Sequence, residues 1–406
     1  MSQILLVTFS SLAGTKRVRR IVGLLGLTVL AGLVACQITP AARSITADPP
    51  MPTTSPAPIL SLTSLPIPMS TPTLVPIRAL RVDYEYVEAS RNEVAGLEQK
   101  MKEAGVNLVA IGAGRVDWTY FKWQGHEDVW SSDVRETNMD FLAEDAAHFS
   151  QWASVNVVVD VFAPRYIAAH PHTAAISWQG QPSHHLVSTM QLVEGDLGQQ
   201  LLAMLDYLAA HYPVDSISIT ELSYYIEGYG DDDKAAYMRY TGRSDWPRLP
   251  NGLVNIDDPT IGEWRSYEIS RFIAQAANIV HRYHKKLYVD VEVSWGHLER
   301  EATERGQNYG MLLQSADRLV LWDYFGLSGY EPEYTARIAQ SVQKYGPDRI
   351  IISIGLWARN GVISPEALRR AMLAGLQSPI PNLWITPSLF LSDEHWQVIQ
   401  ELWSHN

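Results

Sequence analysis

The feature that most constrains the fold is a regular alternation of two kinds of segment along residues 78–406. One kind is a short run of apolar and β-branched residues, which is typical of a buried strand. Eight such runs are present, at residues 79–87, 106–114, 155–163, 214–222, 286–295, 316–325, 348–357 and 382–391.

The segments between these runs carry apolar residues at three- and four-residue spacing, which indicates amphipathic helices. Clear cases are residues 92–105, 197–213, 263–284, 364–377 and 392–403. Eight strands alternating with eight helices predict a parallel sheet, and a length of about 330 residues favours a closed (β/α)8 TIM barrel. An open doubly wound sheet is the alternative. No strand is followed by a GxGxxG or P-loop motif, which argues against a nucleotide site.

The first 35 residues have the pattern of an export signal. KRVRR at residues 16–20 precedes an uncharged apolar run at 21–35, which is short for a membrane span. LVAC at 33–36 resembles the lipobox of bacterial lipoproteins, and by that resemblance Cys36 is the lipidated first residue of the mature protein. An ordinary secretion signal and an uncleaved anchor are the alternatives.

Residues 36–77 are dominated by Pro, Ser and Thr, and this composition does not support a packed element. We expect a tether that holds the 78–406 domain away from a membrane. The predicted location is therefore extracytoplasmic, at the cell surface or the periplasmic face.

Charge and cysteine content exclude several classes of function. The formal net charge is −12, with no basic stripe, so a nucleic-acid partner is not expected. Cys36 is the single cysteine, which rules out a disulfide within the chain and any multi-cysteine metal site. No cofactor is expected.

Long loops follow three of the predicted strands. They cover residues 115–136, 164–196 and 223–260, whereas the segments leading into strands are short. All three would lie at the carboxyl ends of the strands, which is the face where barrels build active sites.

Acidic residues gather at the same ends of the strands. Because strand side chains alternate between faces, the valines of LYVDVEVSW would face the helices, and the acids between them would point into the barrel. The acids considered for the site are Asp83, Glu85, Asp160, Glu221, Asp290, Glu292 and Asp323.

Converging carboxylates without cysteines suit acid/base chemistry, above all glycoside hydrolysis. Aromatic rings on the same face would stack on sugar rings. Candidate catalytic residues are Glu221, Asp323 and Glu292. Candidate substrate-binding residues are Asp83, Glu85, Arg115, Trp118, Asp160, Tyr224, Asp290, Trp295, Trp322, Tyr324 and Trp357.

Several segments together resemble the glycosyl-hydrolase-like barrels of bacteria. They are VDSISITELSYYIEGYGDDDKAAYMRYTG, the pair Trp264–Arg265 with the helix after it, LQSADRLVLWDYFG, and ASVNVVVDVFAPRYIAAHP, and the resemblance covers about residues 105–360. In that family a catalytic Asp falls on the position of Thr220, and Glu221 stands one residue later.

The Thr220–Glu221 pair is also similar to the Asn-Glu pair of a large glycosidase clan, whose Glu after the fourth strand is the acid/base. By that resemblance Glu221 is the general acid. The clan takes its nucleophile from the end of the seventh strand, where IGLWARNG has no acid, so Glu292 or Asp323 would supply the second carboxylate.

The sequence thus predicts a membrane-tethered glycosidase that acts on a carbohydrate polymer. A carbohydrate-binding lipoprotein without catalysis is one alternative. The other is a metal-dependent hydrolase or deacetylase, in which the acids and the loop histidines would hold a cation; those histidines are His170, His172, His184 and His185.

Overall fold

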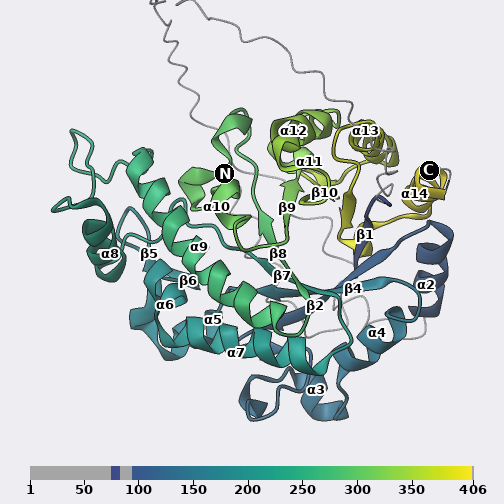
Figure 1. The fold of residues 1–406 in the computed structure, drawn as a ribbon, viewed down its shortest axis with the longest axis horizontal. Helices are drawn as coiled ribbons and strands as arrows, with labels where there is room; N and C mark the ends of the chain where they lie inside the picture. The colour runs from purple at the N-terminus through teal and green to yellow at the C-terminus, as the bar shows by residue number, and fades with distance from the viewer. Residues whose placement is uncertain (1–74, 83–93, 405–406) are drawn as a thin grey trace, which may run out of the picture. The chain divides into compact units, whose positions relative to one another are not determined.

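The computed structural model describes residues 75–82 and 94–404, and within them the chain forms a closed barrel of eight parallel strands (Figure 1). The strands follow one another around the barrel in chain order, and β1 pairs with β2 as well as with β13, which closes the sheet. The predicted TIM barrel is confirmed, and the open-sheet alternative is wrong. The barrel strands are β1 (Arg78–Val82), β2 (Leu108–Arg115), β4 (Ser154–Asp160), β7 (Ser216–Thr220), β8 (Lys286–Val291), β9 (Arg318–Asp323), β10 (Ile350–Gly355) and β13 (Leu383–Thr386).

Helices surround the strands. They are α2 (Val94–Glu103), α3 (Ser132–Thr137), α4 (Phe141–Phe149), α5 (Pro164–Ala169), α6 (Thr189–Val193), α7 (Asp196–His211), α8 (Asp231–Thr241), α9 (Pro259–His281), α10 (Tyr309–Leu312), α11 (Phe325–Ser328), α12 (Tyr334–Val342), α13 (Pro365–Leu376) and α14 (Asp393–Ser404). The expected alternation is weakest between β8 and β9, where α10 has only four residues. The 23-residue helix α9 packs against α10 and β8 in this sector.

Short strands are present in the connections that follow β2, β4 and β10. β3 (Trp118–Thr119) pairs with the end of β2, β5 (Ala174–Ile176) pairs with β6 (Pro182–Val187), and β11 (Trp357–Ala358) pairs with β12 (Gly361–Val362). All of these pieces follow barrel strands, so the extra structure lies at the carboxyl ends of the strands, called here the barrel mouth.

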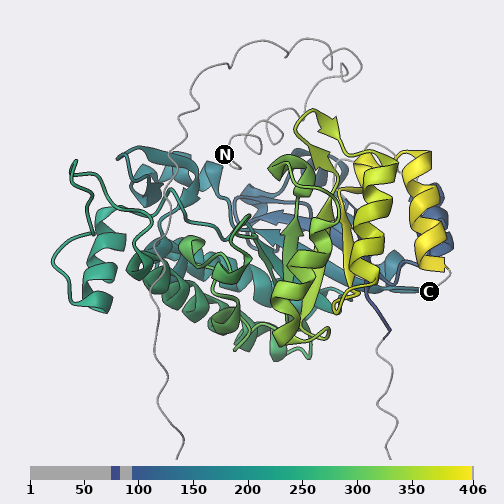
Figure 2. The same ribbon diagram turned by 90° about the horizontal axis from the view of Figure 1, so that it is seen from above.

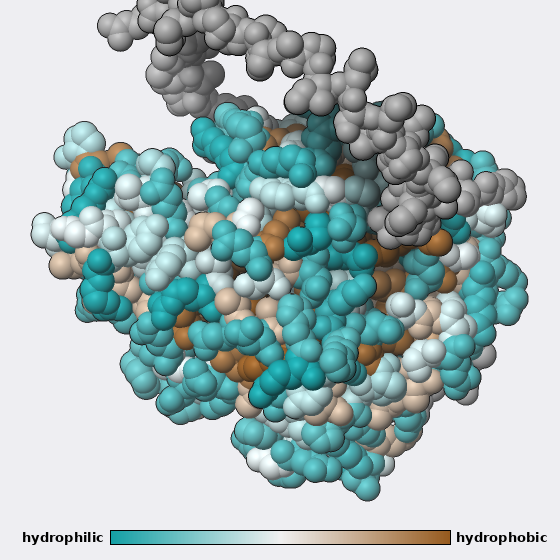
Figure 3. Space-filling view, in the orientation of Figure 1, coloured by the Kyte–Doolittle hydropathy of each residue, from teal (hydrophilic) through white to brown (hydrophobic). Residues whose placement is uncertain are grey.

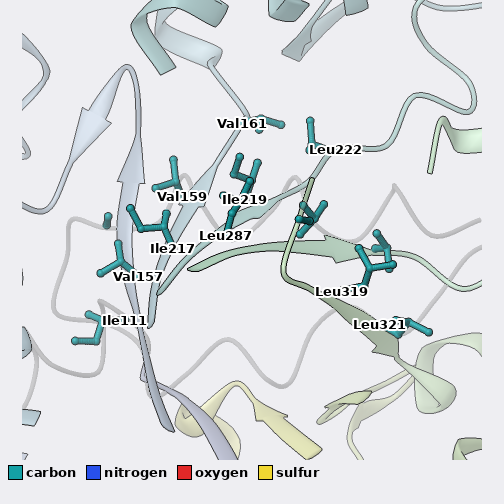
Figure 4. Packing of buried hydrophobic residues seen from close by; sticks show 14 of the residues in the cluster. Ile111, Val157, Val159, Val161, Ile217, Ile219, Leu222, Leu287, Leu319 and Leu321 are labelled. Atoms are coloured by element: carbon teal, nitrogen blue, oxygen red, sulfur yellow. The ribbon is translucent and has the colours of Figure 1, made fainter. Parts of the chain in front are cut away.

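The strand residues alternate between two layers. Outward-facing residues such as Val157, Ile219 and Leu321 pack in the large cluster beneath the helices (Figure 4). Inward-facing residues such as Val158 and Tyr288 form a smaller cluster inside the barrel. This period of two is what fixes which acids can reach the mouth.

The barrel interior is partly polar and its polar groups are paired. Asn156 donates to Ser216 (2.8 Å), and Ser218 donates to Asn156 (3.0 Å). These inward side chains are buried, so their hydrogen bonds satisfy groups that would otherwise be costly to bury.

Helix α8 and residues 242–258 project from the side of the barrel (Figures 1 and 2). A separate aromatic cluster, which includes Tyr237, Trp246 and Trp264, supports this projection. In the view of Figure 3 the surface is mostly hydrophilic, with apolar side chains in patches between polar ones.

A buried arginine fastens the loop after β7. Arg265 on α9 has no exposed surface, and its guanidinium lies 4.4 Å from the centre of the Tyr229 ring. It donates to the carbonyls of Glu227 (2.6 Å), Gly228 (3.3 Å) and Tyr225 (3.4 Å). The Trp264–Arg265 pair in the sequence thus anchors the segment that follows Glu221.

No helix within residues 75–82 and 94–404 is long and apolar enough to cross a membrane. The predicted signal peptide, Cys36 and nearly all of the predicted tether lie outside the described residues, as do Asp83 and Glu85.

We predict that Arg265→Met destabilises the domain by on the order of 2–4 kcal/mol, because three loop carbonyls, two of them in buried hydrogen bonds, lose a charged donor. Urea unfolding of the full chain measures this change. Arg243→Met is the control, since Arg243 is exposed and meets Asp258 at 3.5 Å in a surface ion pair worth less than about 1 kcal/mol. Equal effects of the two substitutions would contradict the anchoring role of Arg265.

Candidate active site

Glu221 reaches the barrel mouth through an unusual backbone conformation. It directly follows β7 and has φ = 67°, in the left-handed region. Thr220, the last residue of β7, faces inward and hydrogen-bonds Asp290. Strict alternation would turn Glu221 toward the helices, but the left-handed turn directs it back to the mouth, where its carboxyl interacts with Asp160 and Glu292.

Contacts of the next two residues hold this turn. Leu222 accepts a hydrogen bond from Gln307 through its carbonyl (2.7 Å), and the Ser223 amide donates to the carbonyl of Glu221 (2.9 Å). The Ser223 hydroxyl donates to Glu292 (2.5 Å). A left-handed non-glycine residue costs roughly 1–2 kcal/mol, so these contacts stabilise a conformation that β7 alone would not adopt.

The Glu221 carboxyl lies among other acids. Burial raises its pKa well above the usual value, and the negative charges of Asp160, Glu292 and Asp290 raise it further, while Arg81 opposes them. These surroundings favour the protonated form of the carboxyl, which is the form that a general acid needs.

Asp160 and Asp290 flank Glu221 on the neighbouring strands. Burial raises the pKa of each to about 6. Asp160 accepts a hydrogen bond from the Phe162 amide (2.8 Å), and Asp290 accepts side-chain bonds from Thr220 and Trp322. Arg81 on β1 favours the ionised form of both.

Glu292 has a different environment. Its carboxyl accepts from Ser223 (2.5 Å) and pairs with Arg305 (3.3 Å), and its amide donates to Gln307 (2.8 Å). Its carbonyl accepts from Tyr309. The Glu292 carboxyl is thus held by a cation from the β8–β9 connection and a hydroxyl from the segment after β7.

Arg115 and Trp118 form the β2 side of the mouth. Arg115 pairs with Asp117 (3.1 Å), its guanidinium lies 5.9 Å from the centre of the Trp118 ring, and its charge acts on Asp160. Asp117 also accepts from the Arg165 amide (2.6 Å), which ties the mouth to the start of α5.

Three aromatic side chains, the aromatic wall, line the β9–β10 side. The rings of Trp322 and Tyr324 stack with centres 5.4 Å apart, and Tyr324 contacts Trp357 at 5.1 Å. The charges of Asp290, Glu221 and Arg81 all act on the Tyr324 hydroxyl, which places the wall beside the acids. The structure therefore brings Trp322, Tyr324 and Trp357 to one wall.

Trp295 belongs to a different group of rings. It stacks on Tyr330 (5.0 Å) and Tyr334 (5.4 Å), and the Gly296 amide next to it donates to the Tyr334 hydroxyl. It is half-buried, and these ring contacts direct it toward α12.

Two predicted site residues lie away from the mouth. Asp323 shares the outward face of β9 with Leu321, is fully buried, and accepts from Thr335 on α12, so the prediction that it pairs with Glu221 is wrong. Tyr224 is fully buried beside Asp233 and Glu227, so the prediction that it binds substrate is also wrong.

Burial raises the pKa of Asp323 to about 7, because the charged form of a carboxyl is costly beneath a helix. The strand period could have excluded it, because Trp322 and Asp323 are adjacent and cannot both face inward on a regular strand.

Sequence reasoning did not identify Ser223, Arg305 and Gln307. Gln307 and Arg305 lie between β8 and β9, where no short motif marks them. Ser223 is the second residue after Glu221, so the position of Ser223 depends on the left-handed backbone conformation of Glu221.

Among the loop histidines, the rings of His170 and His172 contact each other with centres 6.4 Å apart. His170 and His172 flank the start of an exposed turn after α5, and His184 and His185 lie on β6. Across residues 75–82 and 94–404, no three His, Cys, Asp or Glu side chains come together as a group that could hold a metal ion.

No protein-family model and no curated protein matches the chain. Solved structures do. The glycoside hydrolase domain of PgaB (BpsB) from Bordetella bronchiseptica is 17% identical, with a TM-score of 0.63 over 81% of this chain and 99% of that chain. The catalytic domain of β-amylase from Paenibacillus polymyxa is 9% identical, with a TM-score of 0.57 over 81% and 98%.

A β-galactosidase from the psychrophilic Marinomonas ef1 is 13% identical, with a TM-score of 0.60 over 80% of this chain and 59% of that chain. The chain shares its (β/α)8 fold with these glycoside hydrolases. This agrees with the resemblance seen in the sequence.

We predict that Gly355→Ala disturbs the aromatic wall. A Cβ at Gly355 would lie 2.3 Å from the Tyr324 ring, so the ring must move, at a cost of about 1–3 kcal/mol. Near-UV circular dichroism and urea unfolding measure both effects. Gly112→Ala on β2 is the control, because a Cβ there meets nothing within 4 Å; an unchanged aromatic spectrum for Gly355→Ala would contradict the packing.

Asp290 should make the domain less stable as pH rises. Its folded pKa of about 6 lies above the usual 3.8, so its contribution is largest below pH 4 and is lost as pH rises through 6. Asp290→Asn should therefore reduce the loss of unfolding free energy between pH 4 and pH 8, by on the order of 2 kcal/mol.

Denaturant unfolding across that pH range measures the difference. Asp128→Asn, at an exposed position, should leave the pH dependence unchanged. If Asp290→Asn and Asp128→Asn give parallel curves, Asp290 is not the buried carboxyl described here.

Proposed function

We propose that the protein is a secreted, membrane-tethered glycoside hydrolase that acts on a carbohydrate polymer. The observation that carries the proposal is the left-handed turn that brings Glu221 into the acids of the barrel mouth. The fold shared with glycoside hydrolases and the aromatic wall support it.

The two glutamates suit different roles. Burial and negative neighbours raise the pKa of Glu221 and favour its protonated form, which can donate a proton to the glycosidic oxygen as the bond to the leaving sugar breaks. Arg305 and Ser223 hold the Glu292 carboxyl in place, and as a carboxylate it can attack the anomeric carbon or take a proton from the water that attacks it. One acid and one carboxylate at the same mouth are what this chemistry requires.

The remaining polar groups would orient the sugar and set the charges. Arg81 interacts with Asp160, Glu221 and Asp290, so it limits the repulsion among them. Arg115 and Trp118 would contact the substrate on the β2 side.

Glu221→Gln should lower kcat by 100-fold or more, because the amide keeps the shape but cannot donate the proton. Glu292→Gln should lower it at least as much. Reducing-end release from a panel of α- and β-linked polysaccharides, with the full chain, measures the loss. Glu366→Gln, at an exposed position on α13, is the control. Full activity of Glu221→Gln on a substrate that the wild type cleaves would refute the assignment.

The tether is a separate part of the proposal. KRVRR, the apolar run at 21–35 and Cys36 within LVAC support lipidation, and the Pro-, Ser- and Thr-rich residues 36–77 would span the distance to the domain. We predict that labelled palmitate is incorporated in a bacterial host and that Cys36→Ser abolishes it. Label retained by Cys36→Ser would mean that the chain is not anchored through this residue.

A further inference from the structure

Three buried polar atoms near the carboxyl ends of β8 and β13 have no hydrogen-bond partner among the residues that the structure describes. They are Oδ1 of Asp290, Oγ1 of Thr386 and Oγ of Ser388, on side chains that are 4%, 3% and 3% exposed. Buried polar atoms are normally paired, and one left unpaired costs about 1–3 kcal/mol. Such atoms at a candidate active site are positions where a ligand would supply the missing bond.

Thr386 faces the interior at the mouth. It is the last residue of β13, two residues after Trp384, which belongs to the cluster inside the barrel. Its neighbour in the sheet is Gly355 on β10. With no side chain at Gly355, the Tyr324 ring can lie against this backbone, where a Cβ would be 2.3 Å from it.

Ser388 continues the same side. It begins the short 3-10 turn Ser388–Phe390, which contacts β1. The Phe390 ring in this turn meets Trp357 of the aromatic wall, with centres 6.1 Å apart. Ser388 is thus on a turn that borders both β1 and the wall.

Asp290 joins the other end of the wall. It accepts a side-chain hydrogen bond from Trp322, whose ring stacks on Tyr324. A continuous series of contacts therefore connects Asp290, through Trp322 and Tyr324 of the aromatic wall, with the backbone at Gly355 and its sheet neighbour Thr386.

We propose that Asp290, Thr386 and Ser388 bind the hydroxyl groups of a single sugar residue whose ring lies against the aromatic wall. A sugar hydroxyl can donate to the free carboxylate oxygen, and it can both donate to and accept from Thr and Ser hydroxyls. The apolar C–H face of the ring matches Trp322 and Tyr324. An anion is a poor match because Asp290 would repel it.

This inference rests on the proposed function and adds to it. It assigns Thr386 and Ser388, which no sequence motif marks, to substrate recognition rather than to bond cleavage. Removing either hydroxyl should therefore raise the dissociation constant and KM and change kcat little.

Calorimetric titration of the full chain carrying Glu221→Gln tests the proposal, because sugar is then bound without being cleaved. The probes are glucose, galactose, mannose, N-acetylglucosamine and glucosamine, with the α- and β-linked tetrasaccharides of each. We expect at least one to bind, and Thr386→Val and Ser388→Ala each to weaken that sugar by about 3- to 10-fold.

Thr189→Val is the matched control. Thr189 is also fully buried and its Oγ1 also lacks a partner in the described part of the chain, but it lies beside Gly228 and Asp233, away from the mouth. Its substitution should leave sugar binding unchanged. Removing an unpaired buried hydroxyl should not lower the unfolding temperature, so a melting curve separates lost binding from lost fold.

The outcomes separate this inference from the proposed function. Unchanged affinity in both Thr386→Val and Ser388→Ala, or no binding of any probe, overturns the sugar site, even if the wild type hydrolyses a polysaccharide. Sugar binding that both substitutions weaken supports the site, even if the wild type cleaves nothing, in which case the proposed hydrolase activity fails alone.

Discussion

The closed eight-stranded sheet imposes one constraint on everything at the mouth: along each strand only every second side chain can face inward. Outward positions are filled by Val, Ile and Leu beneath the helices, and inward positions hold both apolar and polar groups. Glu221 stands at an outward position by this count. The left-handed backbone at Glu221 interrupts the alternation. The side chains of Thr220 and Glu221 therefore both point toward the mouth.

The same turn creates the chemical asymmetry of the site. It places the Glu221 carboxyl near Asp160, Asp290 and Glu292. The negative charges of these residues favour the protonated form of Glu221. It also places Ser223 against Glu292, which Arg305 approaches from the β8–β9 connection. One backbone conformation thus contributes both to the raised pKa of Glu221 and to the hydrogen bond that holds the Glu292 carboxyl.

The fold was predictable because strand and helix patterns differ in period and repeat eight times. The acids of β4 and β8 were predictable for the same reason, since Asp160 and Asp290 obey the alternation. Asp323 also stands at the end of β9, but it follows the inward-facing Trp322, so the alternation turns it outward beneath α12.

Other parts of the site could not be read from the sequence. A positive φ at a non-glycine residue has no reliable sequence signal, so the orientation of Glu221 and the position of Ser223 stayed open. The unpaired hydroxyls of Thr386 and Ser388 depend on which groups surround them, and only the folded barrel determines this.

The most direct test of the account is the titration of Glu221 itself. Carboxyl ¹³C chemical shifts of labelled glutamate, followed against pH with Glu221→Gln to assign the signal, report its pKa in the folded protein. We predict a pKa well above the usual value of 4.5, and a lower pKa in the Glu292→Gln variant, because a negative neighbour is removed. A Glu221 pKa near 4.5 that does not respond to Glu292→Gln would contradict the central claim that the turn places Glu221 among the acids of the mouth.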